Sequence, residues 1–180
     1  MKNSLFNLKA LAKLGILCAI SIVLVYFIHF PIFPAGSFLE YDPADISILI
    51  GTFAFGPVAG LLLTLVVSII QGVTVSAGSG LYGIIMHVIA TSVLSLVSGL
   101  IYNKNKTRVG AVIALGAGTL AMTFVMFFAN LVVTPLFTGY PVSAILGLMP
   151  FILGFNAIKA GINSIITFFL YKRISKFIRK

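Results

Sequence analysis

Residues 109–158 read VGAVIALGAGTLAMTFVMFFANLVVTPLFTGYPVSAILGLMPFILGFNAI and contain no Asp, Glu, Lys or Arg. A second stretch without these residues extends from Ile46 to Asn103. A helix needs about 20 predominantly apolar residues to cross the hydrocarbon core of a bilayer. The two stretches are therefore long enough to hold several crossings, and they predict an integral membrane protein.

The composition excludes most soluble classes of protein. Of 180 residues, 60% are hydrophobic and only 8% are charged, whereas a soluble domain is about 25% charged. The net charge is +9, but the positive residues lie in clusters between long apolar stretches and not along a polar face, which argues against nucleic-acid binding. The apolar runs are continuous and do not alternate, so they favour helices over a transmembrane barrel.

Pro and Gly residues divide the chain into six predicted transmembrane helices in a single membrane domain, residues 1–180. The predicted ranges are about 8–28, 43–55, 58–75, 81–102, 109–133 and 151–177. An irregular connector is predicted over 134–150, with a short helix at 142–148. The 43–55 segment is only ~20 Å long, so its crossing requires that cavity-lining loops enter the membrane at its ends.

The positive charges indicate which helix ends share a side of the membrane. Eleven of the 12 Lys and Arg residues fall in three clusters: the N-terminus from Lys2 to Lys13, the 104–108 loop, and the C-terminus from Lys172 to Lys180. Such residues collect in short cytoplasmic loops, and six crossings place all three clusters on that side. We therefore predict cytoplasmic termini and a binding site that opens outward. The three acidic residues are predicted to lie on the outer face: Glu40, Asp42 and Asp45.

Lys159 is the one positive residue outside these clusters. It lies about 12 Å inside the outer end of the last helix, where a charge costs a few kcal/mol and marks a functional site. Asn156, Asn163 and Thr167 share its face of the helix, and Asn130 of the preceding helix is expected to face this stripe. With every acid assigned to the outer loop, we expect a ligand carbonyl or a water-filled pocket to be the partner of Lys159. Asn163 and Thr167 are expected to join helices by hydrogen bonds.

The outer loop contains the other candidate residues. Asp42 fits as the N-cap of the 43–55 helix and Asp45 lies near its positive end, so capping is favoured over ligand contact for both. Leu39 and Tyr41 are expected to form a lid over an outer pocket or to act as interface anchors. Gly78, in a break on the same face, is also a candidate pocket residue.

No catalytic constellation is recognisable in the sequence. His29 and His87 are isolated, so no metal site is predicted, and there is no nucleotide-binding lysine loop. We predict neither an enzyme nor a protein that holds a cofactor. Ala12, Gly15 and Ala19 form a stripe of small residues on the first helix. Such a stripe suits internal helix packing and the docking of a partner subunit equally well.

Several of these features together resemble the substrate-binding S components of energy-coupling factor (ECF) vitamin transporters. The resemblance covers nearly the whole chain and is closest to the riboflavin-specific members. It is carried by the small-residue stripe from Gly15 to Ala19, by Phe33-Pro34 and the segment from Leu39 to Ile46, by the segment from Phe55 to Gly60, and by Asn130 with Asn156-x-x-Lys159.

The resemblance implies a function and a set of site residues. The protein would capture riboflavin with high affinity outside the bacterial cytoplasmic membrane and deliver it by toppling within the bilayer. Its first-helix stripe would dock on a membrane coupling subunit that carries two ATPase subunits. The implied ligand-binding residues are Leu39, Tyr41, Gly78, Asn130, Asn156 and Lys159.

Three alternative functions remain. One is an S component for a different vitamin. Another is a membrane-embedded enzyme or assembly factor for a lipid-soluble substrate, which would need a catalytic cluster. The third is a solitary proton-coupled carrier, which normally uses an intramembrane acid, whereas every acid here is expected to lie in or beside the outer loop.

Overall fold

The computed structural model describes residues 7–33 and 39–179, with side chains to residue 174. Lys2, Pro34 and Lys180 of the sequence analysis lie outside this part of the chain. The described part contains six α-helices, which confirms the all-α class. They are α1 (Leu8–Phe27), α2 (Ala44–Phe55), α3 (Pro57–Val73), α4 (Gly80–Lys104), α5 (Arg108–Thr138) and α6 (Val142–Arg179). A short 3-10 helix, η2 (Ala77–Ser79), precedes α4, and strands β1 (Phe30–Pro31) and β2 (Glu40–Tyr41) pair antiparallel.

Four of the helices are long and apolar enough to cross a membrane: α1, α5, α6 and the η2–α4 segment. The other two, α2 and α3, have 12 and 17 residues. Gly56 separates α2 from α3 with a φ of 99°, a conformation that favours glycine. The Gly56-Pro57 pair is therefore a turn, as its sequence indicates.

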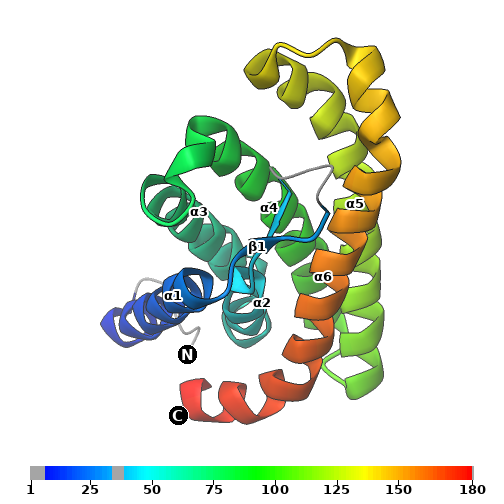
Figure 1. Ribbon diagram of the computed structural model, residues 1–180. Helices are drawn as coiled ribbons and strands as arrows, with labels where there is room; N and C mark the ends of the chain where they lie inside the picture. The colour runs from blue at the N-terminus through cyan, green and yellow to red at the C-terminus, as the bar shows by residue number, and fades with distance from the viewer. Residues whose placement is uncertain (1–6, 34–38, 180) are drawn as a thin grey trace.

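The short helix α2 lies at the centre of the bundle (Figure 1). Every residue from Ala44 to Phe53 is buried, and α2 packs against α1, α3, α4 and α6. A helix that is apolar on all sides is buried on all sides. Because its neighbours shield it from lipid, α2 does not need the length of an independent membrane span.

The prediction of an irregular connector over 134–150 is wrong. Helix α5 continues through Pro135 to Thr138, and α6 begins at Val142 and continues through Pro150. A proline removes one helical hydrogen bond, and packing against neighbouring helices lets a membrane helix continue through it. Helices α5 and α6 pack against each other. The α5–α6 hairpin consequently extends beyond the other helices (yellow in Figure 1).

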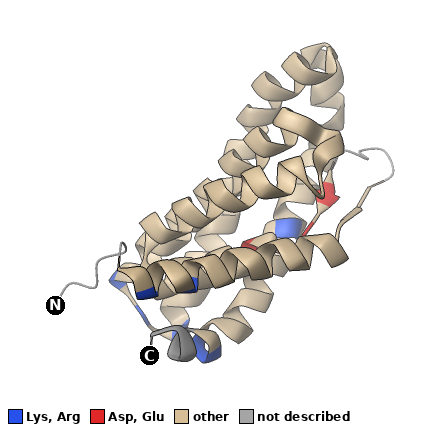
Figure 2. Ribbon diagram, turned by 90° about the vertical axis from the view of Figure 1, so that its left-hand side faces the viewer, with Lys and Arg blue, Asp and Glu red and all other residues tan. Residues whose placement is uncertain are grey.

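The beginning of α1 and the end of α6 lie at the same end of the bundle (Figure 2). Most Lys and Arg positions gather at this end, while the acidic positions lie away from it (Figure 2). A chain whose ends share one side traverses the bundle an even number of times. This arrangement is compatible with six crossings.

Helices α4 and α5 approach closely at Gly118. A Cβ atom there would meet the Ser98 hydroxyl and would lie 3.0 Å from the Leu94 carbonyl oxygen. We expect Gly118→Leu to lower the thermal unfolding midpoint by about 5 °C, because overpacking costs about 1–3 kcal/mol. Gly116→Leu is the matched control, since a Cβ at Gly116 has no neighbour within 4 Å. Equal midpoints for the two variants in detergent would contradict the close approach.

Candidate ligand-binding site

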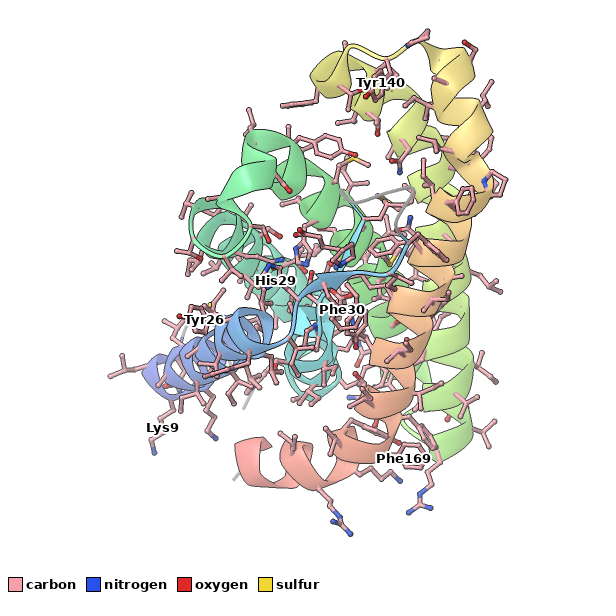
Figure 3. All side chains as sticks on the ribbon, in the orientation of Figure 1. Lys9, Tyr26, His29, Phe30, Tyr140 and Phe169 are labelled. Atoms are coloured by element: carbon pink, nitrogen blue, oxygen red, sulfur yellow. The ribbon has the colours of Figure 1, made fainter. Side chains whose placement is uncertain are left out.

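A pocket lies between α3, α4, α5 and α6. The segment that joins α1 to α2 forms part of its lining. The pocket contains about 790 Å³ of space free of protein atoms, its open mouth included. Figure 3 shows His29 between the end of α1 and β1, where it is exposed, whereas Tyr140 lies far from it on the α5–α6 hairpin. The polar side chains that line the pocket are His29, Glu40, Asp42, Ser68, Gln71, Ser76, Ser79, Tyr82, His87, Asn130, Asn156 and Lys159.

Lys159 lines this pocket and forms an ion pair within it. Its Nζ lies 2.7 Å from Oδ2 of Asp42, and the two residues are only 6% and 3% exposed. The Asp42 Oδ1 atom also accepts a hydrogen bond from the Ala44 N–H, at the start of α2, at 3.1 Å. The N-cap residue is Pro43, however, so the prediction that Asp42 is the N-cap is wrong. The same carboxylate therefore binds the first N–H of α2 and neutralises Lys159.

The expectation that no acid neutralises Lys159 is wrong. Asp42 and Asp45 are both buried inside the bundle, because the chain turns inward after β2 to begin the central helix α2. A solitary proton-coupled carrier normally uses an intramembrane acid, and the burial of Asp42 and Asp45 means that the position of the acids no longer counts against this class. Lys159 retains two further N–H donors beyond the one that Asp42 accepts.

A second group of hydrogen bonds ties α6 to the start of α2. Asn163 donates from Nδ2 to the Asp42 carbonyl and to Oδ2 of Asp45, both at 3.0 Å. Its Oδ1 accepts from the Tyr41 hydroxyl at 3.0 Å, and Thr91 donates to Oδ1 of Asp45 at 2.7 Å. Asn163 therefore joins two parts of the bundle, as its depth in the helix predicts.

Two polar residues on α3 and α4 also approach the Asp42 carboxylate. Gln71 donates from Nε2 to Oδ2 of Asp42 at 3.2 Å. The His87 Nδ1 atom lies 2.7 Å from the Ser68 hydroxyl, while its Nε2 lies 3.9 Å from Oδ1 of Asp42. The Gln71 Oε1 and His87 Nε2 atoms are buried and have no hydrogen-bond partner in the described part of the chain.

Four of the six predicted ligand-binding residues line this pocket: Leu39, Asn130, Asn156 and Lys159. Tyr41 is buried beneath it, where its hydroxyl binds Asn163, and it is not among the lining residues. Gly78 lies exposed on η2, away from the pocket lining.

Asn130 and Asn156 bond to the backbone of their own helices. Asn130 donates to the Met126 carbonyl and Asn156 to the Ile152 carbonyl, each at 2.8 Å. Because each amide has two N–H groups, one donor per residue remains for another partner. Apolar side chains of α5 and α6 complete this wall of the pocket: Met122, Met126 and Phe155.

Sequence reasoning missed Gln71 and His87 as pocket residues. His87 was judged only as a possible metal ligand, and it has no second ligand nearby in sequence. Within the described residues no group of three or more His, Cys, Asp or Glu side chains is placed to hold a metal ion. The missed signal is the one that identified Lys159: a strongly polar residue inside an apolar membrane helix.

The small-residue stripe of α1 points away from the bundle. Ala12, Gly15 and Ala19 are exposed, while the buried side chains of α1 lie on its opposite face. A Cβ at Gly15 would have no neighbour within 4 Å. The stripe therefore does not serve internal packing, and this surface of the described chain is open to another helix.

Comparison with known proteins places the chain in a family. The family model of the ECF transporter substrate-specific component matches residues 9–171. The riboflavin transporter RibU of Staphylococcus aureus (strain TCH60) is 30% identical over 96% of this chain and 93% of its own. RibU of Streptococcus thermophilus is 26% identical, over 97% and 86% of the two chains. The riboflavin transporter FmnP of Bacillus subtilis (strain 168) is 24% identical, over 97% and 96%.

A solved structure agrees with the sequence comparisons. The structure of the S component of a bacterial ECF transporter superposes with a TM-score of 0.80 at 30% identity, and the match covers 94% of this chain and 97% of the other. These similarities and the four long apolar helices indicate a multi-pass bacterial membrane protein that is not an enzyme. Because the family model matches most of the chain, the protein belongs to the family of substrate-specific components of ECF transporters.

Proposed function

We propose that this S component binds riboflavin with high affinity in the pocket between α3 and α6. The observation that carries the proposal is the α5–α6 wall, where polar donors and apolar side chains lie side by side. A flavin ring needs both, because its faces are apolar while its pyrimidine edge has carbonyl acceptors and an N–H donor. The names of the three riboflavin transporters similar to this chain support the same ligand.

The polar edge of the ring would lie against Asn130, Asn156 and Lys159. The free amide protons and the remaining ammonium protons of these residues would donate to the ring carbonyls, and an amide oxygen would accept from the ring N–H. Met122, Met126 and Phe155 would pack against the faces of the ring. Leu39, which is buried above the pocket, would cover the bound vitamin, whereas Tyr41 would act indirectly through Asn163.

The pocket would receive the vitamin from outside the cell. Most Lys and Arg positions gather at the end of the bundle that holds the beginning of α1 and the end of α6, away from the acidic positions (Figure 2). If this basic end is cytoplasmic, both termini are cytoplasmic, the six helices give six crossings, and the pocket mouth faces outward. Uptake would require a membrane coupling subunit and two ATPase subunits, with the exposed α1 stripe as the docking surface.

Purification without added ligand tests the proposed ligand. We expect the purified protein to carry a yellow fluorescent flavin, and the ligand-free protein to quench riboflavin fluorescence at a one-to-one ratio with a dissociation constant in the nanomolar range. Thiamine, biotin and pantothenate are the matched competitors and should not displace the flavin. Displacement by one of them, or the absence of quenching, would contradict riboflavin as the ligand.

A further inference from the structure

The pocket has a second polar wall, which the flavin ring does not need. It is formed by α3 and α4, and its central members are Gln71 and His87. Both approach the Asp42 carboxylate, Gln71 at Oδ2 and His87 towards Oδ1. Gln71 and Lys159 of α6 both bind Oδ2 of Asp42, so this wall meets the α6 wall at that carboxylate. It therefore offers a place for a polar part of the ligand beside the proposed ring site.

Gln71 has an acceptor without a donor. Its Nε2 donates to Asp42 at 3.2 Å, which fixes the orientation of the amide, because the opposite orientation would place two oxygens together. Its Oε1 is then left buried without a hydrogen-bond partner among the described residues. A buried unsatisfied polar atom costs about 1–3 kcal/mol, and a ligand donor would remove this cost.

His87 also has a buried ring nitrogen, Nε2, without a hydrogen-bond partner among the described residues. The Ser68 hydroxyl donates to the Thr64 carbonyl at 2.6 Å, so its oxygen accepts from the Nδ1–H of His87 at 2.7 Å. The opposite Nε2 lies 3.9 Å from Asp42 and 3.8 Å from Asp45, which is too far for a hydrogen bond. Nε2 therefore needs a partner, as an acceptor when the ring is neutral and as a donor when it is protonated.

Hydroxyl groups meet both requirements. One hydroxyl donates to Gln71 Oε1, and a second hydroxyl donates to His87 Nε2 when the ring is neutral or accepts from it when the ring is protonated. A carbonyl or a methyl group would leave the Gln71 acceptor unpaired. We propose that the α3–α4 wall, through Gln71 and His87, is a polyol subsite that binds the hydroxyl-bearing chain of the ligand. This inference rests on the proposed function, in which the chain is the ribityl group of riboflavin.

The subsite predicts discrimination between flavins. Lumiflavin has the ring of riboflavin but a methyl group in place of the ribityl chain. We expect the wild-type protein to bind riboflavin at least 10-fold more tightly than lumiflavin, because two buried acceptors stay unpaired with lumiflavin. Gln71→Met and His87→Phe should each weaken riboflavin binding about 10-fold and change lumiflavin binding less than about twofold.

Thr74→Val is the control outside the pocket. The Thr74 hydroxyl is exposed and donates to the Ile70 carbonyl at 2.6 Å, so its removal should leave both affinities and their ratio unchanged. Titration by fluorescence quenching measures both flavins. Equal binding of the two flavins by wild type, or an equal loss of both in the variants, would refute the polyol subsite while riboflavin binding still stands. Failure of the wild type to bind riboflavin would instead refute the proposed function.

The wild-type comparison needs no substitution, so it decides the question even if one variant fails to fold.

Discussion

Lys159→Met should lower the thermal unfolding midpoint by about 10 °C and weaken riboflavin binding at least 10-fold. Removing one partner of a buried ion pair leaves the other charge without compensation, at a cost of about 3 kcal/mol, and for a chain of this size each kcal/mol lowers the midpoint by about 2–4 °C. The charge left behind is the carboxylate of Asp42, 2.7 Å from the ammonium in the wild type. The loss of affinity follows separately from the loss of the ammonium donors.

A double variant separates the two effects. Asp42→Asn combined with Lys159→Met removes both charges, so most of the lost stability should return. Asparagine keeps an acceptor for the Ala44 N–H, which Asp42 accepts at 3.1 Å. Riboflavin binding should remain weak, because the ammonium is still absent. Differential scanning fluorimetry in detergent and flavin titration measure the two properties.

Lys172→Met is the control, since Lys172 is exposed near the end of α6 and should change neither property. Recovery of full riboflavin affinity in the double variant would show that Lys159 has only a structural role.

The sequence identified Lys159 for a sound reason but assigned it the wrong partner. The free energy of placing a charge in an apolar helix is a local property, and it can be read from the residues around Lys159. The position of Asp42 is not local. It depends on α2 lying at the centre of the bundle, because only then does the segment before α2 enter the core. A 12-residue apolar helix is compatible with a short membrane span as well as with a buried central helix.

The remaining differences also arise from tertiary structure. Pro135 and Pro150 predict breaks, but α5 and α6 continue through them, because neighbouring helices can offset the lost hydrogen bonds in a membrane bundle. Gln71 lies close to Asp42 only because α3 packs beside α2. By contrast, Asn130 and Asn156 could be expected to lie together, since both lie near the outer ends of adjacent antiparallel helices. Helical periodicity places residues on a face, whereas the partner across the pocket depends on the packing of the whole bundle.

Gly15→Leu should abolish riboflavin uptake while leaving riboflavin binding by the isolated protein unchanged. Gly15 is exposed at the centre of the α1 stripe, between Ala12 and Ala19, and its position leaves room for a Cβ atom. Leucine also has a higher helix propensity than glycine, by up to about 1 kcal/mol, so the fold should not suffer. A bulky side chain would instead prevent the close approach of a partner helix, which small residues permit.

The experiment compares binding, assembly and transport in the same cells. We expect Gly15→Leu to retain wild-type quenching of riboflavin fluorescence, to co-purify with the coupling subunit at less than a tenth of the wild-type level, and to fail to support growth of a riboflavin auxotroph. Gly116→Leu makes the same substitution at another open glycine, on α5, and should behave as wild type in all three assays. If both variants transport riboflavin normally, the coupling subunit docks elsewhere, and the exposure of the α1 stripe reflects contact with lipid alone. Loss of transport only in Gly15→Leu would instead show that binding and coupling use different surfaces. The ligand would bind in the pocket between α3 and α6, and coupling to ATP hydrolysis would use the exposed face of α1.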